Sequence, residues 1–160
     1  NCSSAASDVY KRQIIYNTIV ILKIVIDTNV FISALRSSHG ASYRLLRLVG
    51  KDRFTTYVSV PLVLEYESTA KRQSRSIGLL HSDIDDILDY LCMVSEHRRI
   101  FFLWRPFLKD PKDDMVLELA VEAEVEYIVT HNLKDFHGVE HFGIKAIPPQ
   151  EFLRKIGEIP

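Results

Sequence analysis

The sequence predicts an α/β domain with a mainly parallel central sheet of about five strands and helices on both faces. Short apolar runs rich in β-branched residues alternate with amphipathic helical patterns along most of the chain. This alternation is typical of parallel sheets covered by helices. The length of 160 residues suits one domain with one hydrophobic core.

Five short runs have the composition of strands, because they are apolar, β-branched or aromatic. The first ends abruptly on a carboxylate, Asp27. Since open α/β sheets bind their ligands beyond the carboxyl ends of the strands, Asp27 is the first candidate functional residue. The five predicted strands are 23–26, 54–58, 100–104, 127–130 and 144–147.

Helical patterns lie between these runs. The first covers 30–49 with an interruption at Gly40, and Ser59 before Pro61 is a typical start for the second. Ser82 is the expected cap of the third, while Asp113 opens the fourth and 149–156 form a short final helix. The aromatic residues near the third strand are expected in the core: Phe101, Phe102 and Trp104.

The pattern divides the chain into a leader or extension at 1–22, a domain at 23–156 and a tail at 157–160. The leader places Lys11 and Arg12 before an apolar run, which imitates a secretory signal. Polar residues interrupt that run, no small-residue cleavage site follows, and the run is too short to span a bilayer. The two cysteines, Cys2 and Cys92, are too few and too far apart for a disulfide framework. We therefore expect a cytoplasmic protein without a membrane segment.

The formal net charge is −1, so the chain lacks the overall positive charge that would by itself indicate a nucleic-acid-binding protein. A polyanionic substrate would have to be attracted by local basic patches or by bound cations.

Carboxylates recur at the predicted strand ends and helix starts, where the fold would bring them together. Such a cluster repels itself unless a cation neutralises it, and Mg²⁺ prefers carboxylate oxygens and water. One or two ions of this kind activate water for phosphodiester hydrolysis without a Ser, Cys or His nucleophile. The candidate acids are Asp27, Glu65, Asp113, Asp114 and Asp135.

Four segments in order resemble the motifs of PIN-domain ribonucleases, especially the toxin-like branch related to VapC. They are KIVIDTNVFISAL at 23–35, YVSVPLVLEYE at 57–67, DPKDDMVLELA at 110–120 and YIVTHNLKDF at 127–136. The resemblance implies an Mg²⁺- or Mn²⁺-dependent endoribonuclease with one or two ions, a cognate antitoxin and a homodimer. It places the metal on Asp27, Glu65 and Asp113, with Thr28, Asn29 and Thr130 as polar supports.

Three points in this candidate site stay open. Asp113 is favoured over Asp114 as the direct ligand, with Asp114 kept as a helper, and Glu65 is favoured over Glu67. The family's fourth acid is replaced by Asn132, so that the amide could coordinate the metal or Asp135 could take its place.

Basic side chains beyond the predicted site helices are candidate RNA contacts or solvated helix ends: Arg36, Lys71, Arg72 and Arg75. A non-catalytic PIN module that binds RNA or a protein is the main alternative function, because Asn132 weakens the acid set. A response-regulator receiver or a haloacid-dehalogenase-type phosphatase also places Asp at a strand end. The phosphatase is disfavoured because Asn29 stands where its second Asp belongs.

Overall fold

The structure is a computed structural model that describes residues 20–101 and 106–160. Most of the expected leader (1–19) and two of the expected core aromatics, Phe102 and Trp104, lie outside these described residues. The described chain forms an α/β domain around a five-stranded sheet in the order β3-β2-β1-β4-β5. This confirms the predicted fold class.

All four neighbouring strand pairs are parallel. β1 lies at the centre, with Lys23 opposite Thr55 of β2 and Ile26 opposite Val129 of β4. Parallel pairing puts the carboxyl ends of the strands at one edge, so the residues that follow β1, β2 and β4 meet there. The strands are β1 (Lys23–Ile26), β2 (Thr55–Val58), β3 (Glu96–His97), β4 (Tyr127–Val129) and β5 (Lys145–Ile147).

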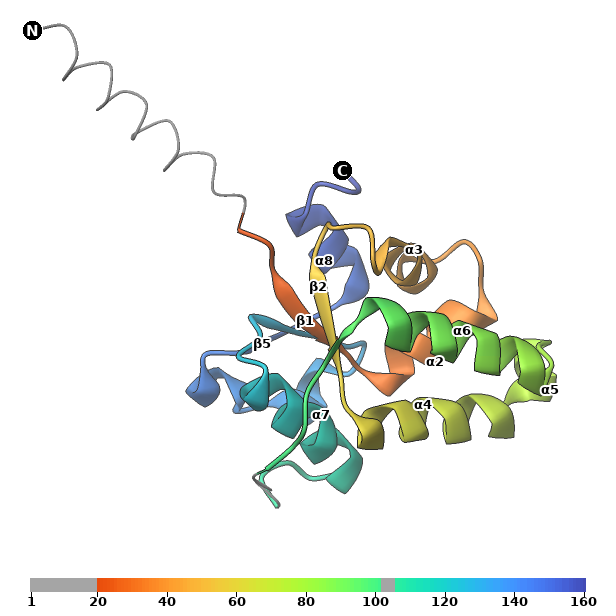
Figure 1. Cartoon of the computed structure of the whole chain (residues 1–160). Helices are drawn as coiled ribbons and strands as arrows, with labels where there is room; N and C mark the ends of the chain where they lie inside the picture. Colours follow the sequence, from red (N-terminus) through yellow and green to blue (C-terminus); the bar gives the residue numbers. More distant parts are fainter. Residues whose placement is uncertain (1–19, 102–105) are drawn as a thin grey trace, which may run out of the picture.

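Helices cover the sheet from both sides: α7 lies on one side, and α2, α3, α4 and α6 lie on the other (Figure 1). The α-helices are α2 (Thr28–Arg36), α3 (Ala41–Leu48), α4 (Val60–Arg72), α5 (Ser74–Ile77), α6 (His81–Val94), α7 (Pro111–Glu122) and α8 (Pro149–Lys155). Two short 3-10 helices follow β4, namely η1 (Leu133–Phe136) and η2 (Val139–Phe142).

Two predicted helix boundaries are confirmed. The pattern over 30–49 breaks into α2 and α3 around Gly40, which is the N-cap of α3. Ser59 caps α4, because its hydroxyl accepts a hydrogen bond from the backbone N–H of Leu62 (3.4 Å) and Pro61 occupies the first turn.

The expected third strand at 100–104 is wrong in its described part. The strand beside β2 is β3, a two-residue edge strand whose residues are both exposed, and neither Ile100 nor Phe101 belongs to it. Phe101 is also 73% exposed rather than part of the core. An exposed edge strand needs no apolar residues, so hydrophobic patterning did not locate β3.

Two helices begin earlier than predicted. α6 begins at His81, before Ser82. The backbone N–H of Leu80, the N-cap residue, donates to the carboxylate of Asp83 (2.8 Å). α7 begins at Pro111 rather than at Asp113, because Asp110 caps it and accepts from the N–H of Lys112 (2.9 Å). In both cases an acid satisfies a backbone N–H group at the N-terminal end of the helix.

The core lies between the sheet and its helices. The whole of β1 after Lys23 is buried, and so is most of α7, from Asp114 to Ala120. None of the helices in the described part of the chain is long and apolar enough to cross a membrane.

Candidate functional site: an acidic cleft at the carboxyl edge of the sheet

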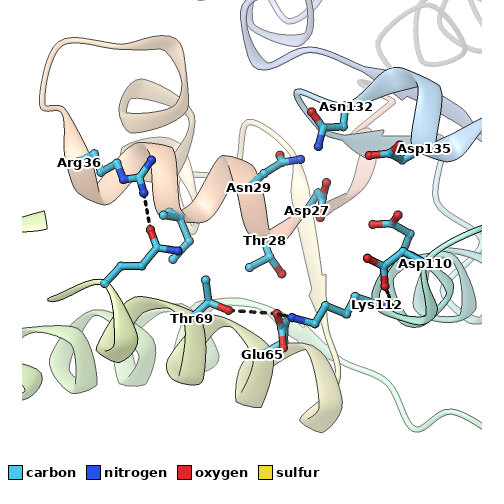
Figure 2. A pocket seen from close by; sticks show the side chains of 13 residues that line it. Asp27, Thr28, Asn29, Arg36, Glu65, Thr69, Asp110, Lys112, Asn132 and Asp135 are labelled. Atoms are coloured by element: carbon cyan, nitrogen blue, oxygen red, sulfur yellow. Dashed lines mark hydrogen bonds and ion pairs between the residues drawn. The ribbon is translucent and has the colours of Figure 1, made fainter. Parts of the chain in front are cut away.

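A cleft of about 340 Å³ opens beyond the carboxyl ends of β1 and β4. Its walls come from α2, α4, the start of α7 and the segment after β4, four parts of the chain that are distant in sequence (Figure 2). It is lined by Asp27, Thr28, Asn29, Ile32, Arg36, Glu65, Thr69, Gln73, Asp110, Lys112, Asp113, Asn132 and Asp135.

The floor of the cleft is a polar corner where β1 and β4 end side by side. The hydroxyl of Thr130 donates to Oδ2 of Asp27 (2.7 Å), and Asn29 Nδ2 donates to the same hydroxyl (3.2 Å). The backbone N–H of Asn132 also donates to Thr130 Oγ1 (3.0 Å). Asp27 stands at the N-cap position of α2, but its side chain makes no capping hydrogen bond. Its carboxylate is instead held by Thr130, the residue that directly follows β4.

A buried tyrosine fixes α4 against this floor. The hydroxyl of Tyr66 donates to the carbonyl oxygen of Ile26, and its ring stacks on Phe31 at a centroid distance of 4.5 Å. Burial raises the pKa of Tyr66, so the hydroxyl remains a donor. Because Glu65 precedes this anchored residue, its side chain reaches the cleft from the α4 side (Figure 2).

The first turn of α7 separates two adjacent carboxylates. Asp113 lines the cleft, whereas Asp114 is buried and its Oδ1 accepts the backbone N–H groups of Leu108 (2.8 Å) and Phe107 (3.3 Å). Successive residues of a helix point about 100° apart, and here that rotation turns Asp114 into the core, where it is 1% exposed. Asp114 therefore fixes the loop before α7 and does not line the site.

Two acids of the cleft, Asp113 and Asp27, have raised pKa values. The pKa of Asp113 is raised to about 7, first by burial and then by the negative charges of Asp27, Asp110, Asp135 and Asp114. The pKa of Asp27 is also raised, mainly by burial, although the hydrogen bond from Thr130 opposes the shift. A bound cation would favour the charged form of both groups.

The donor set fits a hard cation in its chemistry, since it consists of carboxylate and amide oxygens. Across residues 20–101 and 106–160, however, no three Asp, Glu, His or Cys side chains are arranged closely enough to hold a metal ion. Glu65 is engaged within the protein, because its Oε1 accepts from Lys112 Nζ (3.1 Å) and from the hydroxyl of Thr69 (3.0 Å). Figure 2 shows this ion pair connecting α4 with the start of α7.

The cleft gathers most of the residues proposed from the sequence: Asp27, Thr28, Asn29, Arg36, Glu65, Asp113, Asn132 and Asp135. Thr130 lies beneath them and is fully buried. Arg36 donates to the side chain of Gln73 at the far end of the cleft.

Other candidates lie outside the cleft. Lys71 forms ion pairs with Glu67 (2.6 Å) and with Asp85 of α6 (2.7 Å), which joins α4 to α6 and leaves Glu67 away from the site. Arg72 and Arg75 are exposed and do not line the cleft.

Sequence reasoning missed four polar residues of the cleft: Thr69, Gln73, Asp110 and Lys112. A signal for two of them existed, because Asp followed by Pro is a common start of a helix, so α7 could have been extended back to Asp110 and Lys112. Thr69 lies one helical turn after Glu65, which is the spacing at which helix side chains meet.

Comparisons with known proteins bear on the family and the fold of the chain. Residues 23–134 match the profile of a family described as PIN domain. The VapBC2 structure from Rickettsia felis, bound to a DNA fragment from its promoter, has the same fold, with a TM-score of 0.57, 14% identity, and coverage of 79% of this chain and 98% of that chain. A protein named trehalase from Tenebrio molitor is 29% identical over 89 residues, which are 53% of this chain but 16% of that protein. The chain thus spans about one sixth of that relative, and the match assigns it no activity. With its profile match covering most of the domain, the chain belongs to the PIN domain family.

Proposed function

We propose that the protein is a metal-dependent endoribonuclease that hydrolyses phosphodiester bonds of RNA. PIN domains are generally nucleases, and membership of that family gives the reaction class. The observation that carries the proposal is the convergence of carboxylates from the residue after β1, from α4, from the start of α7 and from the segment after β4 in one cleft. No candidate Ser or Cys nucleophile is among the residues that line it.

In this proposal Asp27, Glu65, Asp113 and Asp135 hold Mg²⁺ or Mn²⁺, with Asn132 as a further oxygen donor. Bound ions would activate a water molecule and neutralise the charge that develops on the phosphate. Thr130 orients Asp27 through its 2.7 Å hydrogen bond, and Asn29 orients Thr130 in turn. Supports of this kind around a metal ligand typically contribute about 10- to 100-fold to metal affinity or activity.

The central experiment replaces Asp27 by Asn and compares cleavage of a mixed-sequence, fluorescence-quenched RNA with and without Mg²⁺. Asp86→Asn is the matched control, because Asp86 is exposed on α6. Since supports alone contribute about 10- to 100-fold, loss of a ligand should reduce cleavage by at least about 100-fold. Both variants should remain folded, with a cooperative thermal transition. Full activity in the Asp27 variant, or cleavage in excess chelator, would refute the assignment.

We also propose that the protein is a toxin whose antitoxin partner covers this cleft, and that it forms a homodimer. The structural similarity to VapBC2 supports the pairing. If this is correct, expression of the chain alone should arrest growth, and co-expression of the small protein encoded next to it should restore growth. Light scattering of the purified chain would measure the dimer. Growth without arrest at a high level of the folded protein would contradict the toxin role.

A non-catalytic PIN module is the second candidate, and one contact favours it. The ammonium of Lys112 lies 3.1 Å from Oε1 of Glu65 and neutralises one of the four acids. A module of this kind would bind RNA or a protein without holding a metal ion. Calorimetric titration with Mn²⁺ separates the two candidates, because only the nuclease should bind the ion at submillimolar concentration.

A further inference from the structure

A second hollow of about 430 Å³ lies along α3, and its walls carry the opposite charge to the cleft. We call it the α3 groove. Its cationic side chains are Arg44, Arg47 and Lys51, and its acid is Glu158. Glu158 is already paired with Arg53 (2.8 Å), so it does not neutralise the groove.

The three cations of the α3 groove have no ionic partner within the described chain. Arg44, Arg47 and Lys51 are exposed, and none forms a side-chain hydrogen bond or an ion pair with another described residue. Arg44 and Arg47 are three residues apart on α3, which puts them on one face of the helix. Unlike Lys71, which is held by two acids, these side chains are available to an external anion.

Aromatic surface lies next to this charge. Tyr43 lines the same hollow and is partly exposed, and the guanidinium of Arg47 lies 5.9 Å from the centre of its ring. A basic groove combined with an aromatic side chain is the arrangement by which proteins hold single-stranded nucleic acid, with cations following the phosphates and bases stacking on the ring.

The α3 groove adjoins the acidic cleft. Arg36 lines the cleft and Ser38 lines the groove, and two residues of chain span at most about 7 Å. A second connection runs through Ser42 of α3, whose hydroxyl lies 2.9 Å from Nε2 of His131. The N–H of His131 donates in turn to Asn29 in the cleft (3.2 Å). One strand of nucleic acid can therefore contact both hollows.

The cleft itself cannot attract such a strand by its own charge. Its lining contains five acids and two bases, and the whole chain has a net charge of −1. In the absence of a bound cation, a polyanion therefore has to be held by a basic surface nearby. We propose that the α3 groove binds the phosphate backbone of single-stranded RNA next to the scissile bond, a role that rests on the proposed nuclease function.

The test measures RNA binding by fluorescence anisotropy in excess chelator, so that it does not depend on cleavage. The probe is a fluorescein-labelled, single-stranded RNA long enough to reach both hollows. Arg44→Ala/Arg47→Ala should weaken binding and lower the slope of log affinity against log salt by about 1.4, that is, about 0.7 for each phosphate that the variant no longer neutralises. Circular dichroism should show an unchanged fold.

Arg99→Ala/Lys145→Ala is the matched control, because it removes two exposed cations near β3 and β5 and should leave the salt slope unchanged. Equal losses of affinity in both double variants would mean that only net charge matters and would overturn the proposal. A larger loss of affinity in Arg72→Ala/Arg75→Ala would place the RNA along α4 instead and would also overturn it. Because binding is measured without metal, a wild type that binds RNA through the groove but fails to cleave it with Mg²⁺ would refute only the nuclease function.

Discussion

The two sides of the first turn of α7 carry the same chemical group in different surroundings. On the cleft side, Asp113 lies among other acids and its pKa is raised to about 7. On the core side, Asp114 is 1% exposed and accepts two backbone N–H groups of the preceding loop. Two consecutive aspartates thus have separate surroundings: Asp113 faces the proposed metal site, and Asp114 holds the loop that precedes the helix. Three predictions test this division, and a fourth concerns the ion pair that Lys112 of the same turn forms with Glu65; they run from the largest expected effect to the smallest.

The first prediction separates the two carboxylates by activity. Asp113→Asn should reduce Mg²⁺-dependent RNA cleavage by at least about 100-fold, because it removes a proposed ligand. Asp114→Asn should stay within about tenfold of the wild type, since its amide oxygen still accepts the N–H groups and its effect on the cleft is indirect. Initial rates of RNA cleavage measure both. The opposite order of effects would assign the metal to Asp114.

The second prediction separates them by stability. Asp114→Ala leaves the N–H groups of Phe107 and Leu108 without their acceptor, and an unsatisfied buried group costs about 1–3 kcal/mol. Urea unfolding should show this decrease in stability, and Asp114→Asn should recover most of it. The matched variant Asp113→Ala should not destabilise the metal-free protein. Equal destabilisation by both alanine variants would contradict the division.

The third prediction concerns pH. The folded-state pKa of Asp113, about 7, lies above its usual value near 4, so between these values the folded state binds more protons than the unfolded state. The contribution of Asp113 to stability therefore decreases as pH rises from about 4 to 7 and is constant above that range. Thermal melts of the metal-free protein should show a shallower pH dependence in Asp113→Asn over this interval. A parallel dependence in wild type and variant would rule out the raised pKa.

The fourth prediction concerns the ion pair across the cleft. Lys112→Gln frees Glu65 from the ammonium and should increase Mn²⁺ affinity about two- to fivefold, the range of an exposed salt bridge. Lys134→Gln is the control for general electrostatics, because Lys134 is exposed beside Asp135. Calorimetry measures both affinities. An equal increase in the two variants would show that Lys112 acts through its charge alone rather than through its contact with Glu65.

Part of the candidate site was predictable from local patterns. Apolar runs located β1, β2, β4 and β5 to within one or two residues, and parallel topology then placed Asp27 beside Thr130. Patterning failed at β3, whose two exposed residues pair only with β2. It also placed Phe101 in the core, although this side chain is 73% exposed, because an aromatic residue carries no local information about what covers it.

The sequence by itself determined the class of fold, the order of the acids along the chain and the family, because these depend on periodicity and on residue types at fixed spacing. Only the tertiary structure decided which acids share a cleft. It separated Asp113 from Asp114, paired Glu65 with Lys112, and used Lys71 to join α4 to α6 instead of leaving it free for RNA. Burial and charge at a side chain depend on neighbours that are distant in sequence, so the electrostatic environment of each acid is set by the packing of strands and helices.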